Sequence, residues 1–150
     1  MFAFGRKGKC RKAANALGPH IHHQIVKAME VRGDVFSSPE ELAFTAGYLR
    51  TLMWDTLDKR NCKEMDFQTE MLKYVCDRVI PQRLWEVVER GEALGESFFD
   101  DSKPEYASAK EAHEPGKDCG IYDGTQLDDS GSLPDNLRRF LVKETLNQFQ

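Results

Sequence analysis

The sequence predicts an all-α protein, an irregular bundle of five or six helices with a long acidic, partly irregular segment before the last helix. Apolar residues recur every three to four positions over most of residues 19–98, which is the period of helices with one buried face. Glycine and proline stand between these stretches, as is typical of helix ends. Because 150 residues fit one compact unit, we expect residues 1–150 to form a single helical domain.

The amino-terminal part predicts an arm followed by two helices. Residues 1–9 are basic and contain two glycines, and we expect a mobile arm there. A short helix should run from Cys10 to Gly18, because glycine suits the end of a helix. Pro19 suits the first turn of the next helix, which should extend to about Val31.

The clearest helix start in the chain lies at residues 37–41. Ser38 can cap the helix, Pro39 fits its first position, and the S-x-x-E spacing is that of a capping box. The helix should end near Arg60 and lie at the centre of the bundle. Its wide apolar stripe consists of Leu42, Phe44, Ala46, Tyr48, Leu49, Leu52, Met53 and Leu57.

A third long helix is expected over residues 65–79. Pro81 should interrupt it, because proline has no backbone N–H and disfavours helical geometry at the residue before it. A kinked helix and two helices that meet at Pro81 both fit the pattern, and we favour the break. The helical pattern resumes from Leu84 to Phe98. The expected core consists of Ile25, Met29, Leu42, Leu49, Leu52, Met53, Leu72, Val75, Val79, Leu84, Val88 and Leu141.

Residues 99–133 differ in composition from the rest of the chain. They are acidic, poor in apolar residues and without a persistent period, so we expect a loop-rich segment. Asp123 and Gly124 could form a two-residue hairpin turn within it. A last helix over residues 134–149, capped by Ser132 or Asp135, should follow.

Charge is distributed unevenly along the chain. The net charge is −4, but residues 1–32 carry a net +6 and residues 92–129 a net −8. Such asymmetry indicates either a basic arm or electrostatic attraction within the chain. An acidic body repels phosphate backbones, so duplex nucleic acid is not the partner that we expect.

The cysteines and the chain's start indicate a cellular compartment. Cys10, Cys62, Cys76 and Cys119 are widely scattered and contain no C-x-x-C pair. The first residues do not have the pattern of a secretory signal, and no apolar run reaches the 18 residues of a membrane span. We therefore expect a cytoplasmic protein with free thiols.

Three histidines within four residues could bind a metal ion. Imidazole binds zinc, nickel and copper, but in a helix only His20 and His23 of this group share a face, since His22 points elsewhere. Two interpretations stay open. The histidines are polar surface residues, or His20 and His23 form a metal site. A small metal-dependent enzyme would use His20, His22 or His23 together with an acid from residues 92–129.

The sequence has none of the usual catalytic patterns. No G-x-S-x-G nucleophile elbow is present. Gly116, Gly120 and Gly124 are spaced by four residues but lack the G-K-[ST] ending of a phosphate loop. We therefore expect no catalytic residues and no cofactor.

The amino-terminal arm combines aromatic and basic residues. Two phenylalanines precede five positive charges, a combination that can adsorb to anionic membranes or contact phosphates. It could equally fold onto the acidic segment or stay solvated. The residues are Phe2, Phe4, Arg6, Lys7, Lys9, Arg11 and Lys12.

Both tryptophans lie beside the apolar stripes and next to charged residues. Partly exposed aromatic residues of this kind serve as anchors in partner-binding surfaces, or as the rim of an ordinary core. With Trp54 and Trp85 as anchors, the sequence predicts a non-enzymatic interaction or regulatory protein that binds a protein partner or itself through helical faces. Binding of anionic membrane or nucleic acid by the arm is the first alternative, and the metal-dependent enzyme is the second.

Overall fold

The computed structural model describes residues 2–58, 69–70, 73–74, 76–77, 84–96, 103–130 and 135–146, without the side chains of residues 2–11, 13–16 and 127–130. These residues form five helices and no strand, which confirms the all-α fold class. The helices are α1 (Phe2–Arg32), α2 (Pro39–Asp58), α4 (Leu84–Gly95), α5 (Pro104–Ser130) and α6 (Asn136–Leu141). The described parts of residues 69–77 are helical as well.

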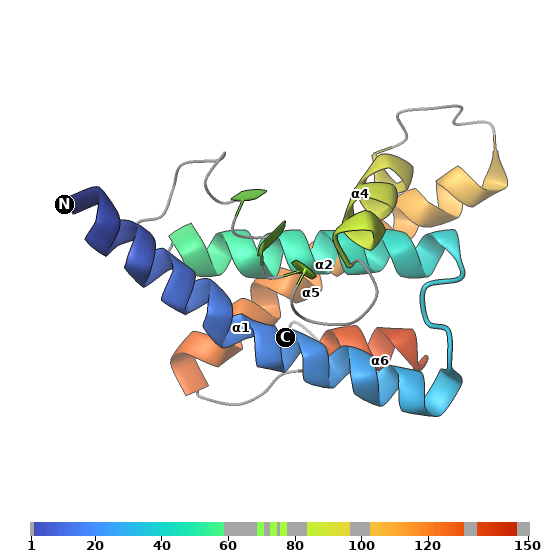
Figure 1. Ribbon diagram of the computed structural model, residues 1–150. Helices are drawn as coiled ribbons and strands as arrows, with labels where there is room; N and C mark the ends of the chain where they lie inside the picture. The colour runs from blue at the N-terminus through green and yellow to red at the C-terminus, as the bar shows by residue number, and fades with distance from the viewer. Residues whose placement is uncertain are drawn as a thin grey trace.

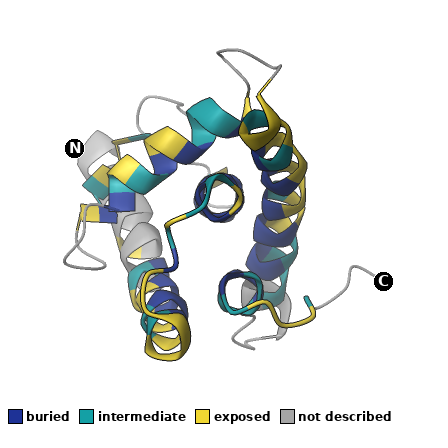
Figure 2. Cartoon of the chain, turned by 90° about the vertical axis from the view of Figure 1, so that its right-hand side faces the viewer, coloured by how far each residue is buried: buried dark blue, intermediate teal, exposed yellow. Residues whose placement is uncertain are grey.

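Helix α2 is the centre of the bundle, as its sequence predicts. Every residue from Glu41 to Leu49 is buried, which requires neighbours on all sides of the helix. In Figure 1, α1, α4, α5 and α6 lie around it, and Figure 2 shows it nearly end on with the buried faces of the other helices turned inward. The predicted cap is present, since the Ser38 hydroxyl accepts a hydrogen bond from the Glu41 backbone N–H at 3.1 Å.

The expected break at Gly18 is wrong, because α1 is continuous from Phe2 through Pro19, and residues 2–9, where the sequence predicts a mobile arm, form the start of this helix. Proline costs one helical hydrogen bond. The buried residues Leu17, Ile21 and Ile25 lie four positions apart and place one continuous apolar face across Pro19. The helix ends where Gly33 adopts a positive φ of 78° and its N–H bonds to the Met29 carbonyl at 2.8 Å.

The expectation of a loop-rich segment over residues 99–133 is wrong over most of its length, because residues 104–130 form α5. Asp123 and Gly124 lie within this helix and form no hairpin. The reason is close packing on α2. A Cβ added to Gly116 or Gly120 would overlap the backbone of α2 at Phe44 or Tyr48, so only glycine lets the two helices approach this closely.

The last helix is shorter than expected, because α6 ends at Leu141 and not near residue 149. Lys143 follows with a positive φ of 64°, and its N–H bonds to the Phe140 carbonyl at 3.1 Å. The Glu144 N–H bonds to the Arg139 carbonyl at 2.8 Å. This pair of bonds is a Schellman motif, which terminates the helix.

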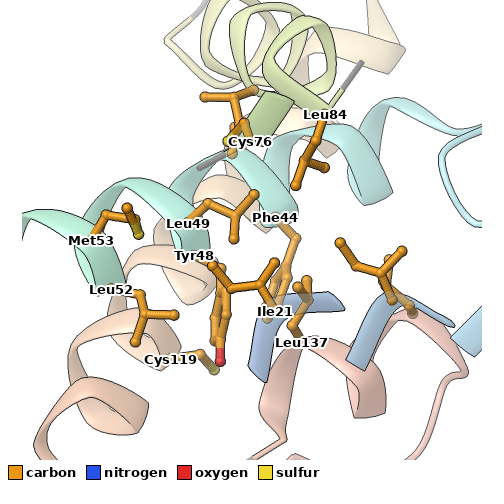
Figure 3. Packing of buried hydrophobic residues seen from close by; sticks show 14 of the residues in the cluster. Ile21, Phe44, Tyr48, Leu49, Leu52, Met53, Cys76, Leu84, Cys119 and Leu137 are labelled. Atoms are coloured by element: carbon orange, nitrogen blue, oxygen red, sulfur yellow. The ribbon is translucent and has the colours of Figure 1, made fainter. Parts of the chain in front are cut away.

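The core lies between α2 and the helices around it. Figure 3 shows Ile21, Phe44 and Leu137 meeting between α1, α2 and α6, while Leu84 and Cys76 cover the opposite side of α2. Of the expected core residues, Met29 is only partly buried, and Leu72, Val75 and Val79 lie outside the described residues. The others are buried as predicted: Ile25, Leu42, Leu49, Leu52, Met53, Leu84, Val88 and Leu141.

Candidate partner-binding site

The two tryptophans of the chain lie on the outer face of α2 and α4, and one cation, Arg50, contacts both rings. Arg50 and Trp54 are four residues apart and therefore share a face of α2. The guanidinium carbon of Arg50 lies 5.0 Å from the ring centroid of Trp54 and 5.3 Å from that of Trp85, in the first turn of α4. Both distances are within the range of cation–π attraction, and both indoles are half-buried.

A carboxylate on α4 forms an ion pair with the same arginine. Glu92 Oε1 lies 3.4 Å from Arg50 Nε and 3.7 Å from His113 Nε2. His113 comes from α5, and a Cβ added to Gly95 would lie 2.6 Å from the His113 Cβ, so the imidazole fills the place of a side chain on α4. The site therefore lies where α2, α4 and α5 meet.

A cavity of about 540 Å³ opens beside Trp85. Three carboxylates and one ammonium group stand around the indole, so the described lining carries an excess of negative charge. Glu86 and Glu89 are exposed and share a face of α4, since they lie three residues apart. The described residues that line the cavity are Lys73, Asp77, Trp85, Glu86 and Glu89.

A second cavity, of about 550 Å³, lies on the outer face of α5. Asp118, Ile121, Tyr122 and Thr125 line it, and Ile121 is 48% exposed. Its described lining carries one charged side chain and is mostly apolar.

The histidines of the predicted metal site have different environments. His20 is buried, with its Nε2 atom 3.2 Å from Gln24 Nε2, whereas His22 and His23 are exposed. Among the described residues, no group of three or more histidine, cysteine or acidic side chains could hold a metal ion. The structure thus brings no further ligand to His20 and His23 within the part of the chain that it describes.

The predicted anionic-surface residues lie at the start of α1. Lys12 is exposed, and the side chains of the other six residues lie outside the description. What the structure adds is the helical backbone from Phe2 onward, which leads away from the other helices to the chain's start in Figure 1.

A buried polar network joins four helices and was missed at the sequence level. The Tyr48 hydroxyl on α2 donates to Asp123 Oδ2 on α5 at 2.6 Å and accepts from Gln24 Nε2 on α1 at 3.1 Å. Asn136, at the start of α6, donates its backbone N–H to Asp123 Oδ2 at 3.1 Å and its side-chain amide to Oδ1 at 2.8 Å. The Arg138 backbone N–H donates to Gln24 Oε1 at 3.2 Å.

Burial alters the acidity of the groups in and near this network. Desolvation, the largest cause, raises the pKa of Asp123 from 3.8 to about 6, although its hydrogen bonds act in the opposite direction. Desolvation and the neighbouring Asp123 raise the pKa of Tyr48 well above 10. Burial also raises the pKa of the Cys76 and Cys119 thiols to about 12, which makes these two cysteines poor nucleophiles.

Comparisons with protein-family models, with curated proteins and with solved structures find no match to this chain. Among the helices that the structure describes, none is long and apolar enough to cross a membrane.

Proposed function

We propose that this chain is a non-enzymatic interaction protein that binds a protein partner through the outer face of α2 and α4, and that the cavity beside Trp85 receives a cationic side chain of the partner. The observation that carries the proposal is the composition of this cavity. An indole and an excess of carboxylates line about 540 Å³ of space, a volume within the range of ligand pockets.

The chemistry of the lining selects a positive charge. An indole face attracts lysine and arginine by ~0.5–1 kcal/mol at an exposed site. Trp85 already contacts Arg50 of its own chain in this way. Asp77, Glu86 and Glu89 add Coulomb attraction for the same ligand and repel phosphate groups. The partner segment that fits is therefore basic, with arginine or lysine at the anchoring position.

A second copy of the chain offers the same chemistry. Residues 2–12 contain five basic residues and two phenylalanines, so self-association through this segment and binding of a different basic protein would use the same cavity.

We place the protein in the cytoplasm, which is supported by Cys76 and Cys119 being free thiols.

Tryptophan fluorescence tests the proposal directly. The Trp54→Phe variant keeps an aromatic ring beside Arg50 and leaves Trp85 as the only tryptophan. The probe is a peptide of residues 2–12 carrying Cys10→Ser, compared with the same peptide in which all five basic residues are glutamate. We expect the basic peptide to change the Trp85 emission with an affinity that falls as salt is added, and the acidic peptide to have no effect.

A pair of matched double variants shows where the peptide binds. Glu86→Gln with Glu89→Gln removes two charges at the cavity and should weaken binding several-fold. Glu105→Gln with Glu111→Gln makes the same change at exposed positions of α5 and should leave binding unchanged. Equal affinity of the first double variant and the wild type would contradict the proposal, as would equal binding of the acidic peptide. Light scattering then shows whether the full chain self-associates.

A second candidate function is binding to anionic surfaces by the start of α1. The observation that favours it is the helical backbone of residues 2–12, because a basic helix with aromatic residues can lie at a membrane interface. Co-sedimentation with phosphatidylserine-containing vesicles, against vesicles of phosphatidylcholine alone, tests this candidate. Binding that requires phosphatidylserine and decreases with salt would support it, and equal binding to both vesicles would contradict it.

A further inference from the structure

We propose that the docking of α6 onto the rest of the bundle is coupled to the uptake of a proton by Asp123, so that α6 is held more tightly in acid than in alkaline solution. This coupling is separate from partner binding at Trp85. It rests on the buried polar network between α1, α2, α5 and α6.

The first support is the isolation of the Asp123 carboxyl from water and from cations. Its residue is 0% exposed. The donors that reach it are neutral: the Tyr48 hydroxyl and the backbone and side-chain amides of Asn136. No lysine, arginine or histidine among the described residues forms an ion pair with it. A buried carboxylate without a cation favours its neutral form.

The second support is that the docked state can accommodate the proton. Asp123 Oδ1 faces the amide of Asn136 at 2.8 Å, and an amide can present either its oxygen or its nitrogen after a half-turn. With the oxygen presented, a proton on Asp123 Oδ1 is donated to Asn136. Asp123 Oδ2 continues to accept from Tyr48 and from the Asn136 backbone. The neutral carboxyl therefore keeps three hydrogen bonds, two with Asn136 of the docked helix and one with Tyr48 on α2.

The surrounding groups do not supply a compensating positive charge. Tyr48 and Cys119 stay neutral, since burial raises the pKa of both. Asp135 disfavours the ionised Asp123, and the arginines near it are paired with Asp135 itself, at 2.7 and 2.8 Å. The titratable and charged groups near the network are His20 on α1, Tyr48 and Asp55 on α2, Asp118 and Cys119 on α5, Asp135 at the N-cap of α6, and Arg138 and Arg139 on α6.

The direction of the effect follows from linkage. The pKa of Asp123 is about 6 with α6 docked, against an ordinary value of 3.8 once the carboxyl meets water. A raised folded-state pKa contributes stability that is fully present below the ordinary value and is lost as the pH rises through about 6. The docking equilibrium should therefore weaken roughly tenfold between pH 5 and pH 7.5.

Hydrogen exchange of the full-length chain measures this equilibrium. Peptides covering residues 136–146 report the opening of α6, and peptides from α4 serve as the internal control, after correction for the intrinsic pH dependence of exchange. We expect about tenfold more opening of α6 at pH 7.5 than at pH 5. The Asp123→Asn variant, which is neutral at every pH and fits the same hydrogen bonds, should show no such change. The same pH dependence in wild type and variant would overturn the proposal.

A direct titration of the wild type keeps the proposal testable even if the variant does not fold. The ¹³C chemical shift of the Asp123 carboxyl, followed by NMR, should change with a midpoint near pH 6. A midpoint below 4.5 would overturn the proposal, because docking would then not be coupled to proton uptake in the range from pH 5 to pH 7.5.

Discussion

Replacement of Gly120 by alanine tests the close contact of α5 with α2. The added Cβ would overlap the Thr51 hydroxyl and the Tyr48 backbone carbonyl, and would lie 3.1 Å from the Leu52 backbone nitrogen. The hydroxyl could rotate, but the carbonyl and the nitrogen belong to the backbone of the central helix. The two helices must therefore move apart.

The expected change in the free energy of unfolding for Gly120→Ala combines a large loss with a smaller gain. Overpacking of a tight interface costs ~1–3 kcal/mol. Separation would also weaken the hydrogen bond from Thr51 Oγ1 to the Lys117 carbonyl, now 2.9 Å long, which contributes about 1 kcal/mol. Alanine in place of glycine within a helix stabilises the helix by about 1 kcal/mol. The balance for Gly120→Ala is a loss of about 2 kcal/mol in the free energy of unfolding, or roughly 4–8 °C in Tm.

Gly124, one turn further along α5, provides the matched control. A Cβ there would lie 3.2 Å from Asp55 Oδ2, the end of a side chain that can rotate, and 3.6 Å from Leu52 Cδ1. Gly124→Ala should therefore be neutral or stabilise the protein by up to about 1 kcal/mol. Urea unfolding followed by circular dichroism at 222 nm measures both variants. Equal stabilisation by the two substitutions would refute the close contact between α2 and α5.

Three further predictions concern a cap, a turn and two thiols. Ser38→Ala removes the acceptor for the Glu41 N–H and should lower the free energy of unfolding by about 1 kcal/mol in urea melts, whereas an unchanged midpoint would contradict the cap. Lys143→Gly relieves the left-handed conformation after α6 and should raise the free energy of unfolding by about 1 kcal/mol, and a loss of stability would contradict the turn. At pH 8 the buried thiols of Cys76 and Cys119, each with a pKa of about 12, should escape alkylation in the native protein and react in urea, as mass spectrometry of the digested chain would show. Native labelling of either thiol would contradict its burial.

The central helix could be predicted from the sequence because its signals are local and strong. Ser38 and Pro39 mark its start, and apolar residues at helical spacing mark its buried faces. The same local reasoning failed at Gly18 and Pro19, which predicted the end of one helix and the start of the next. Packing of Ile21 and Ile25 on one continuous face outweighs the hydrogen bond that Pro19 cannot make.

Helix α5 could not be predicted from propensity, because glycine, proline and aspartate are poor helix formers. Its stability comes from contact with α2, which exists only in the folded protein. One signal was present in the sequence, the spacing of four residues between Gly116, Gly120 and Gly124. This spacing places the glycines on one helix face, where Gly116 and Gly120 allow close approach. In the sequence, the same spacing resembled that of a phosphate loop.

The candidate site could be predicted only as separate residues. The sequence indicates that Trp54 and Trp85 lie at the edges of the apolar faces of their helices. In the structure both tryptophans are half-buried. That they share Arg50 depends on the packing of α4 against α2, two helices separated by more than twenty residues of chain. Asp123 was predicted to lie in a turn and is the buried centre of a network, because its helix was missed.

The most direct test of binding through the outer face of α2 and α4 is two-dimensional ¹H–¹⁵N NMR of the full chain during titration with the basic peptide of residues 2–12. We predict that the indole N–H of Trp85 and the backbone amides of residues 85–90 shift first and most, while those of the core residues Ile25 and Leu49 do not. Shifts centred on Ile121 or on the interior of the bundle, with Trp85 unchanged, would contradict it.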